Sequence, residues 1–263
     1  MTRTSAACTS ARRRSSIRND LFSGQAAVYA ASRPGYPDAL FDFVATQCRG
    51  RSLAWDCATG NGQAATGLAS RFARVVATDL SAGQLAHAVP APNIEYRVSP
   101  AEDSGLAPAS TDLVTVAQAL HWLDHEPFYR EVRRVARPGG IIAAWSYGAC
   151  HAGDDVEGLL RGFEHATLGP FWDSRRRWVD EGYRTIPFPF PEVTTPPFEL
   201  HMEWTVTQLC GYLRSWSAVA TYIRDRHEDP VAPLQERLVK QWGSDGQRRL
   251  VRWPLVIRLG RVG

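Results

Sequence analysis

The sequence predicts an α/β fold in which a doubly wound, mostly parallel, seven-stranded sheet is covered by helices. Short apolar segments alternate with helical segments between residues 50 and 148, which is the pattern of right-handed βαβ units. The segment 112–117 is largely apolar, as expected of a strand whose two faces are both buried. Two further strands are expected after residue 190, and a helical cap is inserted before them.

Hydrophobic periodicity and turn residues place the elements of the first half of the chain. Helices are expected at 24–32, 38–48, 63–72, 81–87 and 127–136. Strands are expected at 52–56, 74–78, 93–98, 112–117 and 141–146. Ser81 is positioned to cap its helix, and turns are expected at Thr59–Gly62 and Pro138–Gly140.

The pattern changes after residue 148. Helices are expected at 154–168, 171–183, 208–215, 218–225 and 231–241, with a loop rich in Pro and Phe at 187–197. Segments 198–204 and 248–258 alternate and predict two strands, the last antiparallel to its neighbour. We therefore expect a tail at 1–20 and one domain at 21–263. Its core is formed by 37–148 and these two strands, and its cap by 21–36 and 150–245.

The composition limits the classes of partner and the cellular compartment that we expect for the protein. The chain has 30 basic and 27 acidic residues, a balance that does not favour a nucleic-acid partner. No apolar run reaches the ~20 residues of a membrane helix, so no membrane partner is expected. The five cysteines form no CxxC pair, which favours a cytoplasmic protein without a metal site. These observations do not address the oligomeric state.

The N-terminal 19 residues contain five Arg and no acid. Acid-poor segments rich in Arg and Ser occur in organelle transit peptides, and they also occur as disordered tails or over-extended starts. The disordered tail is the favoured interpretation.

Three loops at the expected carboxyl ends of the strands carry the candidate chemistry. Gly60 and Gly62 allow the chain to turn sharply and to approach a ligand closely, in a loop that begins with Asp56. Asp79 ends the second strand, 19 residues after Gly60, where a carboxylate can bind the ribose hydroxyls of an adenosine cofactor. Glu102 follows the third strand and can accept a hydrogen bond from the adenine amine.

Taken together, these motifs resemble those of the class I S-adenosylmethionine-dependent methyltransferases, in the branch called type 11. Asp56, Gly60 and Gly62 match its loop pattern D/E-x-G-x-G-x-G, and Ala58 stands in place of the first Gly. Ala101–Glu102 match the adenine-site pair, and Arg137–Gly140 resemble its L-K-P-G-G turn. The resemblance implies a Rossmann-like fold that binds S-adenosyl-L-methionine as its cofactor.

The resemblance also implies a role for each matching residue. Asp79 would bind the ribose, Leu80 would pack on the adenine ring, and Glu102 would accept from its amine. Asp56 would order the loop, and Gln118 would lie near the sulfonium at the end of the fourth strand. These expectations define the predicted cofactor site.

The flanks resemble trans-aconitate-methyltransferase-like proteins, in the segments 22–37, 118–122 and 212–217. This narrower resemblance implies that Tyr29 and Arg33 close over the cofactor, with the Arg33 fork on its carboxylate. His121 is a candidate base or acceptor-site residue, with a packing role as the alternative. Candidates for the acceptor pocket are Trp145, Tyr147, Trp172, Trp178 and Trp216, with Arg161, Arg175 and Arg214 for a carboxylate.

The predicted function is methylation of a small-molecule acceptor, by analogy a carboxylate, through in-line displacement. A nicotinamide-dependent oxidoreductase is the first alternative. It is disfavoured by Asp56, by Glu102 and by the absence of a Tyr-x-x-x-Lys pair in a chain whose single lysine is Lys240. The second alternative is a catalytically silent cofactor-binding module, which only Ala58 favours.

Overall fold

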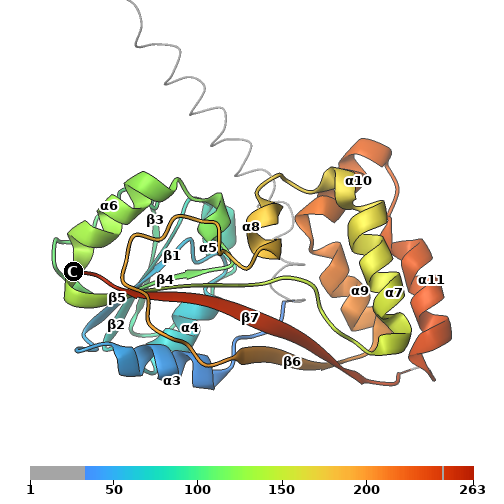
Figure 1. The fold of residues 1–263 in the computed structure, drawn as a ribbon, viewed down its shortest axis with the longest axis horizontal. Helices are drawn as coiled ribbons and strands as arrows, with labels where there is room; N and C mark the ends of the chain where they lie inside the picture. Colours follow the sequence, from blue (N-terminus) through green and yellow to red (C-terminus); the bar gives the residue numbers. More distant parts are fainter. Residues whose placement is uncertain (1–32, 245) are drawn as a thin grey trace, which may run out of the picture.

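The computed structural model describes residues 33–244 and 246–263, which form two lobes joined by long strands (Figure 1). The expected tail at 1–20, the helix at 24–32 and Tyr29 lie outside the described residues. One lobe holds the sheet and its covering helices, and the other is a helical cap.

Seven strands form a single mixed sheet in the order β3-β2-β1-β4-β5-β7-β6. The strands are β1 (Leu53–Cys57), β2 (Arg74–Asp79), β3 (Ile94–Val98), β4 (Thr111–Ala117), β5 (Ala136–Tyr147), β6 (Phe198–Trp204) and β7 (Arg249–Arg261). The first five are parallel, and β7 runs antiparallel to both β5 and β6. The predicted seven-stranded α/β sheet is confirmed, and its far edge is antiparallel.

The helices agree with most of the predicted segments. They are α3 (Asp38–Gln47), α4 (Gln63–Ala69), α5 (Ala82–Leu85), α6 (His125–Val135), α7 (Asp154–Gly162), α8 (Arg176–Asp180), α9 (Val206–Arg214), α10 (Ser217–Arg226) and α11 (Val231–Trp242). Shorter helical turns are η1 (Leu120–Trp122), η2 (Phe163–Thr167) and η3 (Gly169–Phe171). Ser81 caps α5 as expected, because its side chain accepts a hydrogen bond from the N–H of Gln84.

Two local predictions were wrong. The turn expected at Pro138–Gly140 lies within β5, because Ala136 pairs with Thr111 before a shift in register and Gly139 adopts a positive φ of 77°. The long helix expected at 171–183 is reduced to the five residues of α8. There the Asp173 side chain accepts the backbone N–H of Arg175, a local bond that competes with a continuous helix.

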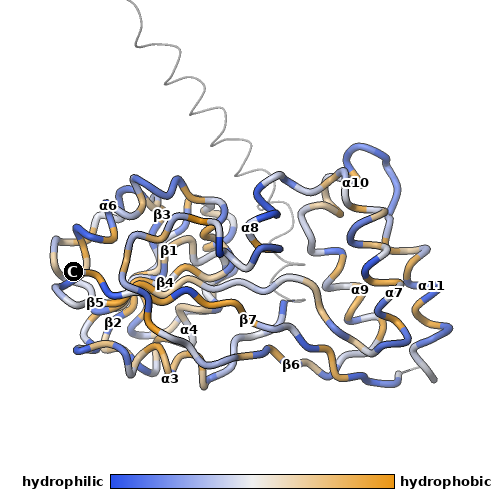
Figure 2. Tube along the Cα trace, viewed as in Figure 1, coloured by the Kyte–Doolittle hydropathy of each residue, from blue (hydrophilic) through white to orange (hydrophobic). Residues whose placement is uncertain are grey.

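The two faces of the sheet build two separate cores. On β2, Val75 and Ala77 pack with α3 and α4, whereas Val76 faces the opposite side with Phe128 and Val132 of α6. This alternation is the period-two pattern of a strand that is buried on both faces. Hydropathy along the backbone follows it, with apolar strands inside and polar helix surfaces outside (Figure 2).

The cap is attached to the far edge of the sheet. Helices α7, α9, α10 and α11 lie together beyond the ends of β6 and β7 (Figure 1). Part of this cap, α9 to α11, lies between β6 and β7 in the sequence rather than before both strands. The indole N–H of Trp253 on β7 donates to the Tyr212 hydroxyl on α9 at 3.1 Å, which joins the cap to the sheet.

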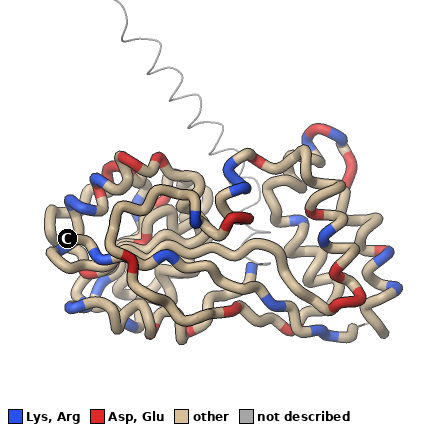
Figure 3. The backbone as a smooth tube through the Cα atoms, in the orientation of Figure 1, with Lys and Arg blue, Asp and Glu red and all other residues tan. Residues whose placement is uncertain are grey.

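Basic and acidic positions are interspersed along the backbone of both lobes (Figure 3). Within 33–244 and 246–263, no helix has the length and apolar character needed to cross a membrane. The same residues contain no group of three or more His, Cys, Asp and Glu arranged to hold a metal ion.

Candidate cofactor and acceptor site

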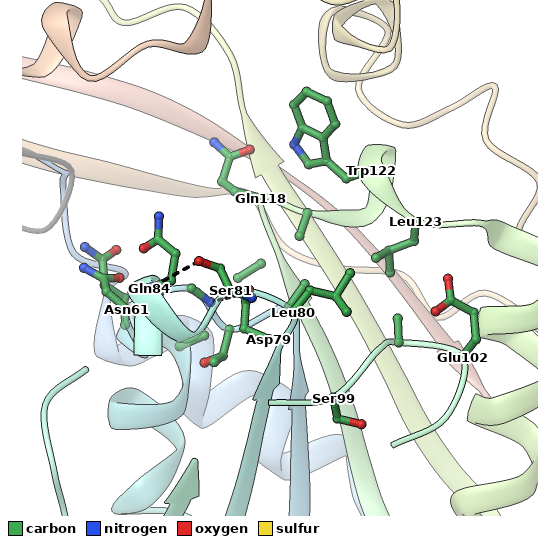
Figure 4. A pocket seen from close by; sticks show the side chains of 18 of the residues that line it. Asn61, Asp79, Leu80, Ser81, Gln84, Ser99, Glu102, Gln118, Trp122 and Leu123 are labelled. Atoms are coloured by element: carbon green, nitrogen blue, oxygen red, sulfur yellow. Dashed lines mark hydrogen bonds between the residues drawn. The ribbon is translucent and has the colours of Figure 1, made fainter. Parts of the chain in front are cut away.

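A cavity opens at the carboxyl ends of the parallel strands, where α/β sheets bind their ligands. Its volume is about 170 Å³. Of the predicted site residues, those that line it are Ala58, Gly60, Asp79, Leu80, Ala101, Glu102 and Gln118. These residues come from the loops after β1 to β4, so the structure brings together most of the predicted cofactor site (Figure 4).

The loop after β1 has a left-handed backbone at three positions. The φ angles are 54° at Ala58, 58° at Gly60 and 83° at Gly62. At Gly60 an added Cβ would meet no atom closer than the Gln84 Oε1 at 3.9 Å. Since Gly60 also lines the cavity, its missing side chain leaves backbone accessible to a ligand.

Gly62 is required by packing and does not line the cavity. It precedes the first residue of α4, and a Cβ there would lie 2.5 Å from the Tyr96 hydroxyl. Gly62 therefore allows the loop to enter α4 beside β3. The sequence pattern located this residue, and the structure gives it a structural position rather than a contact with the cavity.

Asp56 lies beneath the loop and is fully buried. Its carboxylate accepts hydrogen bonds from the hydroxyls of Thr59 in the loop and Thr115 on β4. Burial raises the pKa of Asp56 to about 6, against the lowering effect of these bonds. A buried acceptor shared by two elements holds the loop to the sheet, which is the geometry expected of a loop-ordering residue.

Asp79 ends β2 and faces the cavity (Figure 4). Its Oδ2 accepts the N–H of Gly60 and its Oδ1 accepts the N–H of Ser81, both at 2.8 Å. Burial raises the pKa of Asp79. A carboxylate has about four acceptor positions, so these bonds fix the orientation of Asp79 and leave capacity for ligand hydroxyls.

An apolar platform lies between the two acidic groups of the cavity. Leu80 is 41% exposed although it is large and apolar, and Ala101 and Leu123 line the same region. Figure 4 shows Leu80 between Asp79 and the exposed carboxylate of Glu102. Two hydrogen-bond acceptors separated by an apolar platform fit an adenosine. The flat adenine ring would lie on the platform, with donors on either side of it: the ribose hydroxyls and the adenine amine.

A second, smaller pocket adjoins the first and faces the cap. Gln118 and Trp122 line both pockets, so the two join at the end of β4. The Gln118 Nε2 donates to the Tyr147 carbonyl at 2.9 Å, and the Gln118 backbone has a φ of 54°. Gln118 thus lies where the cofactor cavity meets a second pocket of about 90 Å³.

Positive side chains and aromatic rings line this second pocket. Arg33 lies here rather than at the cofactor cavity, with its guanidinium 5.3 Å from the Tyr212 ring centroid. Arg176 lies 4.3 Å from the Trp172 ring centroid and is held by Glu164 and Asp180. The pocket therefore combines cations with flat apolar walls.

His121 lines the second pocket and is 7% exposed. Its Nδ1 lies 2.8 Å from the Tyr183 hydroxyl. Burial, followed by Arg176 and Arg175, lowers the pKa of His121 to about 3. A ring that is neutral and weakly basic at pH 7 argues against the predicted general base. The position of His121 in the lining of the second pocket agrees with the other predicted role, that of an acceptor-site residue.

Some of the other predicted acceptor-pocket residues line this pocket, and the rest lie outside it. Tyr147, Trp172 and Trp216 line the second pocket, whereas Trp145 is buried in the core and Trp178 packs on His125. The three predicted arginines do not line it. Arg161 is exposed, Arg175 pairs with Asp173 and Arg214 pairs with Asp229.

Several lining residues were missed from the sequence. In the cofactor cavity they are Tyr36, Thr59, Asn61, Gln63, Ala64, Ser81, Gln84, Ser99, Ala117, Ala119, Trp122 and Leu123. Most directly follow a recognised motif, so their place beside a strand end was a signal that could have found them. Arg176 had no such signal, because it reaches the site through the packing of the cap. Tyr212, in contrast, begins the segment 212–217 of the narrower resemblance.

The fold and the site define an α/β protein with a cavity that fits an adenosine cofactor and a second pocket beside it. A family described as "Methyltransferase domain" matches residues 55–144, which span β1 to β5. A Dictyostelium discoideum protein assigned as a methyltransferase is 33% identical over 238 residues, covering 89% of this chain and 90% of that protein.

Two further comparisons extend this similarity. A Saccharomyces cerevisiae protein assigned as an S-adenosylmethionine-dependent methyltransferase is 30% identical, over 78% of this chain and 83% of its own. The structure of an Anaeromyxobacter dehalogenans protein assigned as a type II methyltransferase is 43% identical, with a TM-score of 0.82. It covers 88% of this chain and 98% of that one. The chain belongs to the class I S-adenosylmethionine-dependent methyltransferase family.

Membership of this class implies S-adenosylmethionine as the cofactor, and the cavity fits it. The open space at Gly60, the acceptors Asp79 and Glu102 and the platform of Leu80 match the parts of an adenosyl group. Residues that would hold the cofactor are therefore those of the first cavity.

Proposed function

We propose that the protein methylates a carboxylate group of a small-molecule acceptor, as its resemblance to trans-aconitate-methyltransferase-like proteins also suggests. When bound, S-adenosylmethionine supplies a methyl group activated by its sulfonium. The chain's own residues would orient the acceptor beside that methyl group and exclude water. The proposed partner is thus a small cytoplasmic metabolite rather than a nucleic acid or a membrane.

The combination of cations with weak bases in the second pocket carries this proposal. Arg33 and Arg176 line it, and an arginine fork suits a carboxylate. His121 and Asp173 also line it, and the pKa of each is lowered, His121 by burial and Asp173 chiefly by Arg175. Both groups are therefore weak bases at pH 7. A carboxylate acceptor is already ionised at that pH and needs no base, whereas a hydroxyl acceptor does.

Transfer of a labelled methyl group to a panel of small acids tests the proposal. The panel pairs each acid, including trans-aconitate, with its primary amide and with an alcohol of similar size. We expect transfer to carboxylates only. Arg33→Gln is expected to raise KM about tenfold while leaving the affinity for S-adenosylhomocysteine unchanged, as for the loss of one charged hydrogen bond. Equal kcat/KM for an alcohol and its matched acid would overturn the proposal.

A further inference from the structure

We infer that the acceptor is a flat monocarboxylic acid, such as an aromatic acid, rather than a polycarboxylate. This inference rests on the proposed carboxylate acceptor and narrows its class. Two properties of the second pocket carry it: the balance of charge among the residues that line the pocket, and the aromatic side chains that form its walls.

The charged side chains at the second pocket contain no surplus of positive charge. The charged groups that line the pocket and their ion-pair partners, among the described residues, are Arg33, Arg175, Arg176, Asp173, Glu164 and Asp180. Asp173 pairs with Arg175 at 2.8 Å, and Arg176 is held by both Glu164 and Asp180. The positive and negative charges of these groups therefore cancel before an acceptor enters.

A single negative charge on the acceptor suits this balance. His121 also lines the pocket, but burial lowers its pKa, so the ring is neutral at pH 7 and adds no positive charge. The sulfonium of a bound cofactor carries one positive charge, which one carboxylate balances. Methyl transfer to that carboxylate forms a C–O bond, breaks the methyl–sulfur bond, leaves its electron pair on sulfur and moves no proton. A second or third carboxylate would instead add negative charge to a lining that already contains Asp173.

Three tryptophans contribute to the walls of the second pocket. They are Trp122, Trp172 and Trp216. The rings of Trp172 and Trp216 lie 5.4 Å apart between centroids, at 47° to each other. The Trp172 indole N–H donates to the Glu164 carbonyl at 3.1 Å, so this polar group is already bonded within the protein. Trp172 therefore offers a ligand the apolar surface of its ring.

Arginine side chains hold two of these rings in place. The Arg176 guanidinium lies 4.3 Å from the Trp172 ring centroid, and the Arg175 guanidinium lies 4.6 Å from that of Trp122. Both tryptophans are only half-buried, so part of each ring remains accessible. Fixed, accessible aromatic surfaces favour a flat acceptor, because ring pairs attract each other beyond the burial of apolar area. A saturated acid of the same size lacks this attraction.

Acids that separate charge from shape test the inference on the wild-type enzyme. Benzoate and cyclohexanecarboxylate carry one charge and differ in flatness, whereas trimesate, a benzene tricarboxylate, differs from benzoate in charge. We expect kcat/KM for benzoate to exceed that for cyclohexanecarboxylate about three- to tenfold, the effect of one aromatic pair. It should exceed that for trimesate or trans-aconitate by about 100-fold or more, because like charges repel in a desolvated site. Calorimetric titration of the S-adenosylhomocysteine complex with the same acids should give the same order without turnover.

Replacement of one tryptophan tests the contribution of the walls. Trp172→Leu is expected to bring kcat/KM for benzoate close to that for cyclohexanecarboxylate, with unchanged affinity for S-adenosylhomocysteine as the test of folding. Trp178→Leu is the matched control, since Trp178 is also half-buried but packs on His125 and does not line the second pocket. This control should keep the preference of the wild type.

The results separate this inference from the proposed function. If the wild-type enzyme methylates a tricarboxylate or cyclohexanecarboxylate as efficiently as benzoate, the inference is overturned and the carboxylate proposal stands. That comparison needs no variant, so it does not depend on the folding of Trp172→Leu. If the enzyme methylates alcohols and none of the acids, the proposed function fails, and the inference fails with it.

Discussion

Replacement of Ala58 by Gly is expected to stabilise the protein. Ala58 has a φ of 54° at the position where the family pattern has its first Gly. A left-handed conformation costs an L-residue about 1–2 kcal/mol, and glycine avoids that cost. Against this, glycine lowers the free energy of unfolding by about 0.4–1 kcal/mol, because it gives the unfolded chain more conformational freedom. Ala58 is partly buried, so the loss of its methyl removes part of the ~0.8 kcal/mol of a buried carbon.

These contributions sum to a net gain of about 0.5 kcal/mol in the free energy of unfolding. Urea denaturation of three variants provides the test. Ala109→Gly changes an exposed residue with a φ of 48°, so it should gain about 0.8 kcal/mol without the packing loss. Ala107→Gly changes an exposed residue without a positive φ and should lose about 0.7 kcal/mol.

The order of the three variants in their free energy of unfolding tests whether Ala58 is strained. Ala58→Gly and Ala109→Gly should both lie above the wild type, and Ala107→Gly below it. If Ala58→Gly is as unstable as Ala107→Gly, Ala58 carries no backbone strain, and the reasoning about the loop is refuted.

Three further predictions concern Gly62, Asp56 and Asp112. Gly62→Ala should lower the free energy of unfolding by at least about 2 kcal/mol, through its positive φ and the clash with Tyr96, and Tyr96→Ala in the same chain should recover part of that loss. Because the folded-state pKa of Asp56 is raised to about 6, its stabilising contribution is present below about pH 4 and is lost as the pH rises to 6. The stability of the wild type relative to Asp56→Asn should therefore fall by about 3 kcal/mol between pH 4 and pH 7 in denaturation curves, and parallel curves would contradict the shift. Asp112→Ala should cost about 2–4 kcal/mol in urea denaturation, because Asp112 is buried and pairs with Arg137; a loss below about 0.5 kcal/mol would show that the pair contributes little.

The core of the fold was predictable because its signals are local. Segment 112–117 has the composition of a strand buried on both faces, and it forms the central strand β4. Gly60 and Asp79 were found for a related reason. Gly60 lies in the loop after β1 and Asp79 is the last residue of β2, and parallel strands bring such positions to one edge of the sheet.

The second pocket was predictable only in part, because it is built by tertiary packing. The candidates for it that do line it are His121, Tyr147, Trp172 and Trp216, whereas Arg176 was not among them. Arg33, His121, Arg176 and Trp216 come from four distant parts of the chain. In the run Arg175–Arg177, successive side chains point in different directions, and pairing with Asp173 or Glu164 decides which one reaches the pocket. The left-handed φ of Tyr183 is equally invisible in the sequence, since a tyrosine rarely marks such a turn.

Calorimetric titration with S-adenosylhomocysteine tests the central claim most directly, with NADH as the parallel ligand. We expect micromolar binding of S-adenosylhomocysteine, weakened about 100-fold in Asp79→Ala, as for the loss of hydrogen bonds to a charged group. Asp103→Ala removes an exposed carboxylate that does not line the cavity and should bind as the wild type does. Binding of NADH without binding of S-adenosylhomocysteine, or equal binding by Asp79→Ala and the wild type, would contradict the account.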